Sequence, residues 1–129
     1  MARVLLVHWK PEEAFDGLAL LKGAGHEVHV FDTQGGIGLA KFKSNLPDVV
    51  VISLERLPSH GREVAAWFRS TKVTASTPLV FVGGVEEKVN LVQEAFPDAV
   101  FCTWRGVRGA VTKALRHPQS ANPPARWSN

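Results

Sequence analysis

The run Val49-Val50-Val51-Ile52, which follows Pro47-Asp48 and precedes Ser53, is the most β-branched stretch of this 129-residue chain. β-Branched residues fit the pleated surface of a strand. Because the run is apolar throughout instead of alternating, it indicates a strand buried on both faces, as in the centre of a parallel sheet. Other short apolar runs indicate four further strands, at Arg3–Val7, Glu27–Phe31, Leu79–Val82 and 99–103.

Helical patterns separate these runs. Pro11 favours a helix start, because its missing N–H costs nothing in a first turn, and Gly23 and Gly25 favour the end of that helix. Its apolar stripe is expected to comprise Ala14, Phe15, Leu18 and Leu21. Further helices are expected at 37–45 and, after a loop at 55–61, around residues 64–68. The stripe of a helix at Glu86–Ala95 comprises Val85, Val89, Val92 and Phe96, and that of the last helix comprises Val107, Val111, Ala114 and Leu115.

Strands that alternate with helices pair in parallel through right-handed crossovers. Five such units predict an α/β fold, a three-layer αβα sandwich of flavodoxin-like type. Its five-stranded parallel sheet is expected to have the order 2-1-3-4-5. Ligands of such folds bind beyond the carboxyl ends of the strands. The positions of interest for function are therefore 8–10, 53–58, Gly83-Gly84 and Thr103-Trp104.

The composition is that of an ordinary globular domain, with 45% hydrophobic and 21% charged residues. We expect one domain over residues 1–117. After His117 the composition shifts to Pro, Ser, Asn and Ala, which predicts a disordered tail at 118–129. The sequence shows no apolar stretch of about 20 residues, the length needed to cross a bilayer, and no signal peptide of the usual form. We therefore expect a cytoplasmic protein that does not span a membrane.

The formal net charge is +3, and much of the excess lies late in the chain. The cations there are Arg105, Arg108, Lys113, Arg116 and Arg126. A basic last helix could contact nucleic acid or an acidic partner, although a charge run is more often a solvated face. The sequence contains no nucleic-acid recognition motif, which disfavours nucleic acid. The single cysteine, Cys102, lies in an apolar run and is expected to be a buried, inert thiol.

Four stretches together resemble the receiver domains of response regulators. Residues 3–11, R-V-L-L-V-H-W-K-P, resemble the family's opening R-V-L-L-V-E-D-D-P, and residues 47–53 resemble P-D-L-V-L-L-D. Residues 77–84 are similar to T-P-I-I-x-L-T-A, and residues 98–104 to D-D-Y-L-T-K-P. Gly61 follows Ser53 at the family's interval, whereas Pro58 lies one residue later than the family's loop proline. The resemblance covers residues 3–116 and implies a CheY-like fold.

The functional positions of the family hold other residues here. By this resemblance the degenerate phosphoacceptor site comprises His8, Trp9, Lys10, Ser53, Gly83 and Thr103. Trp9 and Lys10 stand where the family has its metal-binding acids, and an indole and an ammonium cannot bind Mg²⁺. Ser53 stands at the acceptor aspartate, Gly83 at the switch hydroxyl and Thr103 at the lysine. We therefore expect no catalytic residues, no metal, no cofactor and no phosphorylation by the family's mechanism.

The replacing residues leave two structural questions open. Lys10 either reaches solvent or pairs with an acid such as Glu55, which would lock the fold in one state. Trp9 and Trp104 either fill the space left by the lost polar groups or form a stacking platform for a planar ligand. Trp67, on an amphipathic helix, is expected to be a packing residue.

The leading hypothesis is a pseudo-receiver, a phosphorylation-independent protein–protein interaction and signalling module. Its partner is expected to be a signalling protein of unknown identity, and the resemblance implies a homodimer. The expected contact face combines the helix Glu86–Ala95, the strand at 99–103 and the last helix. Residues predicted to line it are Lys88, Gln93, Phe101, Trp104, Arg108 and Arg116.

Two other classes of function remain as alternatives. Ser53-Leu54 and Gly83-Gly84 are similar to signals of cobalamin-binding flavodoxin-like domains, but the motif D-x-H-x-x-G is missing around His8. An enzyme would need Ser53, His8 and His60 to converge, with Asp32 nearby, yet the sequence has no G-x-S-x-G elbow. The run Gly35-Gly36-Ile37-Gly38 is a weak phosphate-nest candidate. His60 is expected to lie on a loop surface.

Overall fold

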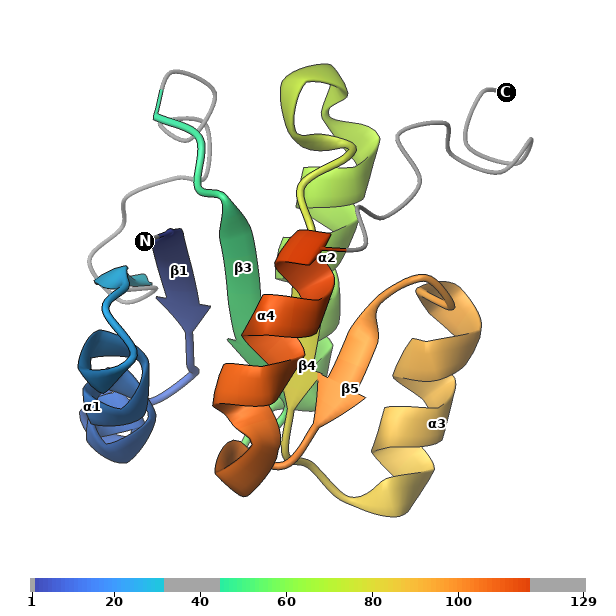
Figure 1. Ribbon diagram of the computed structural model, residues 1–129. Helices are drawn as coiled ribbons and strands as arrows, with labels where there is room; N and C mark the ends of the chain where they lie inside the picture. The colour runs from blue at the N-terminus through green and yellow to red at the C-terminus, as the bar shows by residue number, and fades with distance from the viewer. Residues whose placement is uncertain (1, 32–44, 117–129) are drawn as a thin grey trace.

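The computed structural model describes residues 2–31 and 45–116 of the chain. In this part a five-stranded sheet has the order β2-β1-β3-β4-β5, with parallel pairing between all neighbouring strands, which confirms the order predicted from the sequence. Figure 1 shows the sheet between its covering helices. The strands are β1 (Arg3–Val7), β2 (Glu27–Phe31), β3 (Val49–Ser53), β4 (Leu79–Val82) and β5 (Val100–Cys102).

The helices lie in two layers on either side of the sheet (Figure 1). The α-helices are α1 (Phe15–Gly23), α2 (Pro58–Ser70), α3 (Glu86–Ala95) and α4 (Val107–Arg116). The short 3₁₀ turns are η1 (Pro11–Ala14), η4 (Lys72–Thr74) and η5 (Trp104–Gly106). α1 and α4 cover one face, and α2 and α3 cover the other. The expected helix at 37–45 falls outside the described residues except for Asn45, and the expected tail at 118–129 lies wholly outside them.

β3 lies in the middle of the sheet, and all five of its residues are buried. Val51 pairs with Leu6 of β1 on one side and with Val80 of β4 on the other. An unbroken apolar run is the pattern that such a doubly covered strand requires. β3 therefore brings Ser53 to the carboxyl edge of the sheet.

β5 is shorter than the expected 99–103, because only residues 100–102 are in register with β4. The N–H of Ala99 bonds instead to the carbonyl of Phe96. At the other end, Thr103 already caps η5, so the chain turns away from the sheet. This early turn places Trp104 at the sheet edge.

The two faces of the sheet have separate cores of different composition. Under α2 and α3 the core contains the large rings of Phe68, Phe81 and Phe96, with Phe101 stacked on Phe81 at 5.1 Å between ring centroids. Under α1 and α4 the buried residues are aliphatic or small. They are Val4, Leu6, Ala14, Leu21, Val49, Val51, Val80, Val82, Val107, Ala110, Val111 and Ala114.

Two residues expected in apolar stripes lie at the surface instead. The side chains of Phe15 and Val85 are 65% and 64% exposed. The first turn after Pro11 is the tighter 3₁₀ turn η1, so the phase of α1 changes, and Ala14, Gly17 and Leu21 face the sheet. Val85 is the N-cap of α3 and has extended backbone angles, so it does not follow the helical periodicity.

The expected loop at 55–61 is also shorter in the structure, because α2 begins at Pro58. His60 therefore lies in the first turn of a helix and is half-buried, not on a loop surface. Trp67 is half-buried against Phe68, as expected of a packing residue. Within residues 2–31 and 45–116, the helices are all too short or too polar to traverse a lipid bilayer.

Candidate functional site

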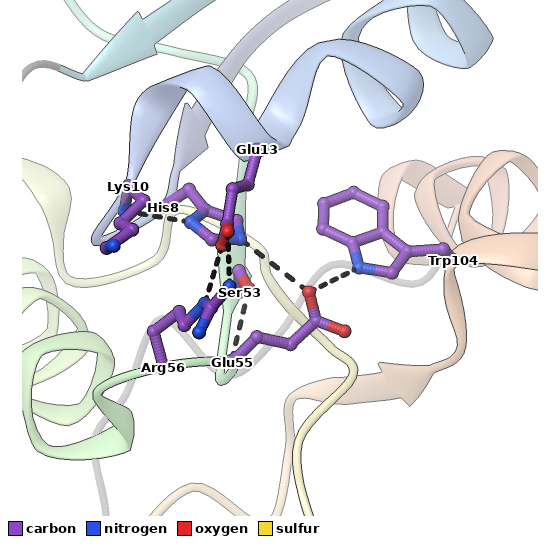
Figure 2. A network of polar contacts seen from close by, with 7 residues as sticks. All are labelled: His8, Lys10, Glu13, Ser53, Glu55, Arg56 and Trp104. Carbon is purple, nitrogen blue, oxygen red and sulfur yellow. Dashed lines mark hydrogen bonds and ion pairs between the residues drawn. The ribbon is translucent and has the colours of Figure 1, made fainter.

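A polar network occupies the carboxyl edge of the sheet, where the ends of β1, β3 and β4 meet the turn η5. Figure 2 shows its side chains converging from the end of β1, from η1, from the end of β3 with the loop that follows it, and from η5. Parallel strands all end at the same edge, so residues far apart in sequence meet there. The sequence-predicted positions His8 and Ser53 are both buried in it, with 0% and 2% of their surface exposed.

The His8 ring is held by a backbone hydrogen bond. Its Nδ1 accepts the N–H of Lys10 at 3.0 Å, so the neutral ring carries its proton on Nε2. Nε2 faces Oε1 of Glu55 at 3.6 Å, which is too long for a hydrogen bond, and it has no hydrogen-bond partner among the described residues. Both nitrogens are thus either occupied or enclosed, so His8 is poorly placed to act as an axial ligand of a cobalamin-type cofactor.

Glu55 is the centre of the network, and sequence reasoning considered it only as a partner for Lys10. Its Oε1 accepts a hydrogen bond from Nε1 of Trp104 at 3.1 Å. The Trp104 ring in turn lies nearly parallel to His8, with 6.5 Å between centroids and 20° between planes. Figure 2 shows the carboxylate between the two rings. The half-exposed carboxylate therefore joins the loop after β3 to η5.

Gly83, at the end of β4, makes room for this carboxylate. A Cβ atom at position 83 would lie 2.8 Å from Oε2 and 2.9 Å from Cγ of Glu55. The backbone φ of Gly83 is +71°, a left-handed conformation that disfavours residues with a side chain. A threonine or serine here, as the receiver family has, would displace Glu55 from its present position.

Ser53 is committed to the turn that follows β3. Its Oγ accepts the backbone N–H of Glu55 at 3.1 Å. Within the part of the chain that the structure describes, neither His8 nor His60 forms a hydrogen bond with this hydroxyl. A serine nucleophile needs an adjacent base, so the arrangement orients Glu55 and does not activate Ser53.

Trp9 and Lys10 lie apart from this network's acid. Trp9 is half-buried and contacts His60 edge to face, with 5.2 Å between ring centroids. The side chain of Lys10 is exposed and forms no ion pair with the residues described, so it reaches solvent and does not pair with Glu55. Burial lowers the pKa of His60, partly opposed by the charge of Glu63.

An ion pair that sequence reasoning did not identify closes one side of the site. Nε of Arg56 donates to Oε1 of Glu13 at 2.8 Å, and Nη2 donates to Oε2 (Figure 2). The hydrogen bond from Arg56 lowers the pKa of the Glu13 carboxyl. Arg56 has φ +70°, an uncommon angle for a non-glycine residue. The pair ties η1 to the loop after β3, and no motif could have revealed it across 43 positions.

The remaining predicted positions are spread along β5, α3 and α4. Thr103 is exposed and accepts the N–H of Gly106 through its carbonyl oxygen at 3.0 Å. Phe101 is half-buried against the core, and Trp104 points into the site instead of outward. The four other predicted interface residues, Lys88, Gln93, Arg108 and Arg116, are exposed.

Cys102, also on β5, fits the expectation of an unreactive thiol. Burial raises its pKa to about 11. Its Sγ lies 3.7 Å from the carbonyl oxygen of Phe81. A thiol that stays protonated at neutral pH is a poor nucleophile.

The donor set at the edge does not fit Mg²⁺, the metal of the receiver family. Mg²⁺ takes octahedral oxygen ligands, usually including one or two carboxylates. Here the carboxylates of the described network are those of Glu55, whose Oε1 accepts a hydrogen bond from Trp104, and of Glu13, which is paired with Arg56. In the described ranges, no group of three or more His, Cys, Asp or Glu side chains could hold a metal ion. The described residues at this edge therefore do not supply the ligand set that Mg²⁺ takes.

Comparisons with known proteins agree with this fold. A scan against models of protein families finds no match. Protein PilH of Pseudomonas aeruginosa is 26% identical over 115 residues, which cover 89% of this chain and 88% of PilH. The chemotaxis protein CheY4 of Vibrio cholerae superposes with a TM-score of 0.69 at 20% identity, over 89% of this chain and 99% of CheY4. The signal receiver domain of a modulated diguanylate cyclase from Desulfovibrio desulfuricans gives 0.65 at 18% identity, over 90% and 94%.

Proposed function

We propose that this chain is a pseudo-receiver, a receiver-type signalling module that acts by binding a protein partner, independently of aspartyl phosphorylation and without enzymatic activity. The proposal depends mainly on the hydrogen bond that Trp104 donates to Glu55. The Glu55 carboxylate lies in the space that a side chain at Gly83 would occupy. This contact occupies the edge of the sheet where, by resemblance, the family binds its phosphoryl group. The similarity to PilH and to solved receiver domains supports a signalling role.

The residues at the edge lack the chemistry of acyl-phosphate formation. Ser53 replaces the carboxylate that would attack the phosphoryl donor, and its Oγ already accepts a backbone hydrogen bond. Phosphoryl transfer also requires positive charge to neutralise the oxygens of the transferred group. At the family's lysine position, Thr103 supplies no cation, and Lys10 extends into solvent.

The same residues supply a fixed arrangement in place of a switch. The Glu55 carboxylate bonds to Trp104 from one side, and Trp104 packs against Gly17 of α1 from the other. η5 and the start of α4 are therefore held against the loop after β3 without any phosphoryl group. A switch needs two states that a ligand binds with different affinity. We infer that this contact favours one state permanently.

The proposed partner surface is the face formed by α3, β5 and α4. Lys88 and Gln93 of α3 and Arg108 and Arg116 of α4 present exposed polar side chains there. By resemblance to the receiver family, a homodimer through this face is part of the proposal. Sedimentation equilibrium of the wild type and of Lys88→Glu tests it, because a dimer that uses this face weakens on charge reversal at Lys88. If the wild type is a monomer at all concentrations, the proposed homodimer is contradicted.

A phosphodonor challenge tests the central claim. The protein is mixed with Mg²⁺ and acetyl phosphate, or with Mg²⁺ and beryllofluoride, and followed by intact mass and tryptophan fluorescence. We expect no added phosphoryl mass and no change in tryptophan fluorescence. The triple variant Trp9→Asp/Lys10→Asp/Ser53→Asp, which restores the family's carboxylates, is the matched control for donor activity. Covalent phosphorylation of any carboxylate of the wild type would overturn the proposal.

A further inference from the structure

The exposed side of α4 and the preceding turn η5 carries an unusual concentration of positive charge. Four cations lie between positions 105 and 116, and the segment 99–116 contains no acid. They are Arg105, Arg108, Lys113 and Arg116. These four charges exceed the net charge of the whole chain, +3. All four side chains are exposed, and none forms an ion pair within the described part of the chain.

The helix geometry points these cations away from the buried side of α4. The opposite side of α4 is buried against the sheet through Val107, Ala110, Val111 and Ala114, each at most 7% exposed. With 3.6 residues per turn, Arg108 and Arg116 then project away from the sheet together. The turn before them is anchored by the bond from Trp104 to Glu55. The charged side is therefore presented on a well-supported helix.

An apolar depression borders this charge. α1 and α4 lie side by side on the same face of the sheet (Figure 1), and a shallow hollow between them is lined by Asp16, Ala19, Leu20, Gly23 and Arg108. Most of these lining groups are apolar or small. Arg108 stands at the border between the hollow and the basic side of α4. We define the basic groove as this hollow together with Arg105, Arg108 and Arg116.

Gly109 leaves part of the exposed surface of α4 without a side chain. It lies inside α4 on the exposed side, where a glycine weakens a helix relative to alanine. Nothing in the fold requires it, because a Cβ atom there would meet no atom within 4 Å. A residue without a side chain beside Arg105 and Arg108 lets another chain approach closely.

We propose that the basic groove docks an acidic amphipathic segment of a partner protein. Carboxylates of the segment would pair with Arg105 and Arg108, and an apolar side chain would enter the hollow between Ala19 and Gly23. The proposal rests on the pseudo-receiver function and names the chemistry of its partner. It moves the contact from the surface formed by α3, β5 and α4 to the side of α4 that faces α1.

Charge and shape favour this occupant over others. Nucleic acid would leave the apolar hollow unused. Residues 117–129 of this chain contain Arg126 and no acid, so they do not complement the groove. A second copy could present Glu86, Glu87 and Glu94 of α3, but Lys88 interrupts that acidic surface.

The first experiment measures binding of a defined probe to the full-length chain. The probe is a fluorescein-labelled helical peptide with leucine on one face and glutamate elsewhere, and its control has glutamine at every glutamate. We expect anisotropy to show saturable binding of the glutamate peptide only, weakened as ionic strength rises because exposed charges are screened. Failure of the glutamate peptide to bind at protein concentrations up to about 1 mM, an affinity near −4 kcal/mol, would overturn the proposal.

Charge reversal locates the site. Arg108→Glu and Arg105→Glu are each expected to lower the affinity for the glutamate peptide by about tenfold, because each variant loses an attractive charge pair and gains a repulsion. Arg62→Glu, on the exposed side of α2 across the sheet, is the matched control and should leave the affinity unchanged. In NMR spectra of the wild type, addition of the glutamate peptide should shift the amide resonances of α1 and α4 and not those of α3. Equal effects of Arg62→Glu and Arg108→Glu would show non-specific attraction and contradict the groove.

The remaining occupants are distinguished in parallel. Tighter binding of a DNA duplex or of anionic phospholipid vesicles, lost on Arg108→Glu, would replace the protein partner with that ligand. Self-association lost on Arg108→Glu without peptide binding would assign the groove to a second copy. If the peptide does not bind, the groove is contradicted but the phosphodonor result is unaffected. If the wild type is phosphorylated, the pseudo-receiver function is contradicted, whereas the measured peptide affinity is unaffected.

Discussion

The two faces of the sheet are built from different side chains although they share the same strands. Under α2 and α3, aromatic rings pack in series, with Phe81 in contact with Phe96 and Phe101. Under α1 and α4, the described buried residues are aliphatic or small, and the aromatic side chain packed against them is Trp104. The first face thus concentrates buried volume, whereas the second has space for the ring that connects the polar network to α4. Stability and function are expected to separate along this division.

The largest effect is expected in the aromatic core. Phe68→Ala should lower the free energy of unfolding by about 3–5 kcal/mol, because a fully buried ring leaves a cavity. Val111→Ala, at an equally buried position under α4, removes two methyl groups and should cost about 2 kcal/mol. Urea unfolding followed by circular dichroism measures both variants. Equal losses would show that the two faces contribute alike.

A smaller loss is expected where α1 touches Trp104. A Cβ atom at Gly17 would lie 2.8 Å from Cε3 of the Trp104 ring and overlap its neighbouring carbon. Gly17→Ala should therefore cost about 1–3 kcal/mol by overpacking. In a Trp104→Leu background the same change should cost less, because the rigid ring is gone. Strictly additive losses in this double-mutant cycle would contradict the close packing.

A glycine-to-alanine substitution on α4 should stabilise the protein, in contrast to Gly17→Ala on α1. Gly109→Ala adds a methyl group in open space inside a helix, and should raise the free energy of unfolding by about 0.5–1 kcal/mol. Thermal unfolding measures the gain. If the groove docks a partner as proposed, the stabilised variant should nevertheless bind the glutamate peptide more weakly. A variant that is more stable and binds the glutamate peptide with unchanged affinity would contradict a role of Gly109 in docking.

The smallest effect is expected at His60 and depends on pH. Burial lowers its pKa in the folded state below the usual 6.5, so the unfolded chain binds the proton more readily. The contribution of neutral His60 is fully present above about pH 6.5 and is lost as the pH falls from there through the folded pKa. Urea unfolding at a series of pH values measures the loss, and His60→Gln should flatten the curve in that window. An unchanged slope would contradict the assignment to His60.

Most of the fold could be predicted because its signals are local. An apolar run such as β3 must be buried on both faces, and alternation with helices then restricts the sheet to few orders. The misplaced residues lie at the starts of helices. Phe15 and Val85 fit an ideal helical stripe, but the 3₁₀ turn η1 and the extended cap of α3 change the phase there. Periodicity contains no information about such irregular first turns.

The candidate site was less predictable than the fold. The resemblance pointed to His8, Ser53 and Gly83, and the structure does bring these three to one edge of the sheet. Their partners could not be inferred. Glu55 was weighed as a partner for Lys10, but it bonds to Trp104, because Gly83 leaves its side chain a path in that direction.

The amino-acid sequence alone determined the strands, their order and the residue types at Trp9, Lys10 and Ser53, since residue identity and hydrophobic spacing are local properties. The contact of Glu55 with Trp104, 49 positions apart, was decided by the tertiary structure. So was the hollow between α1 and α4 beside Arg108. Such contacts depend on where separate loops and helices meet in space, and no repeat along the chain encodes that meeting.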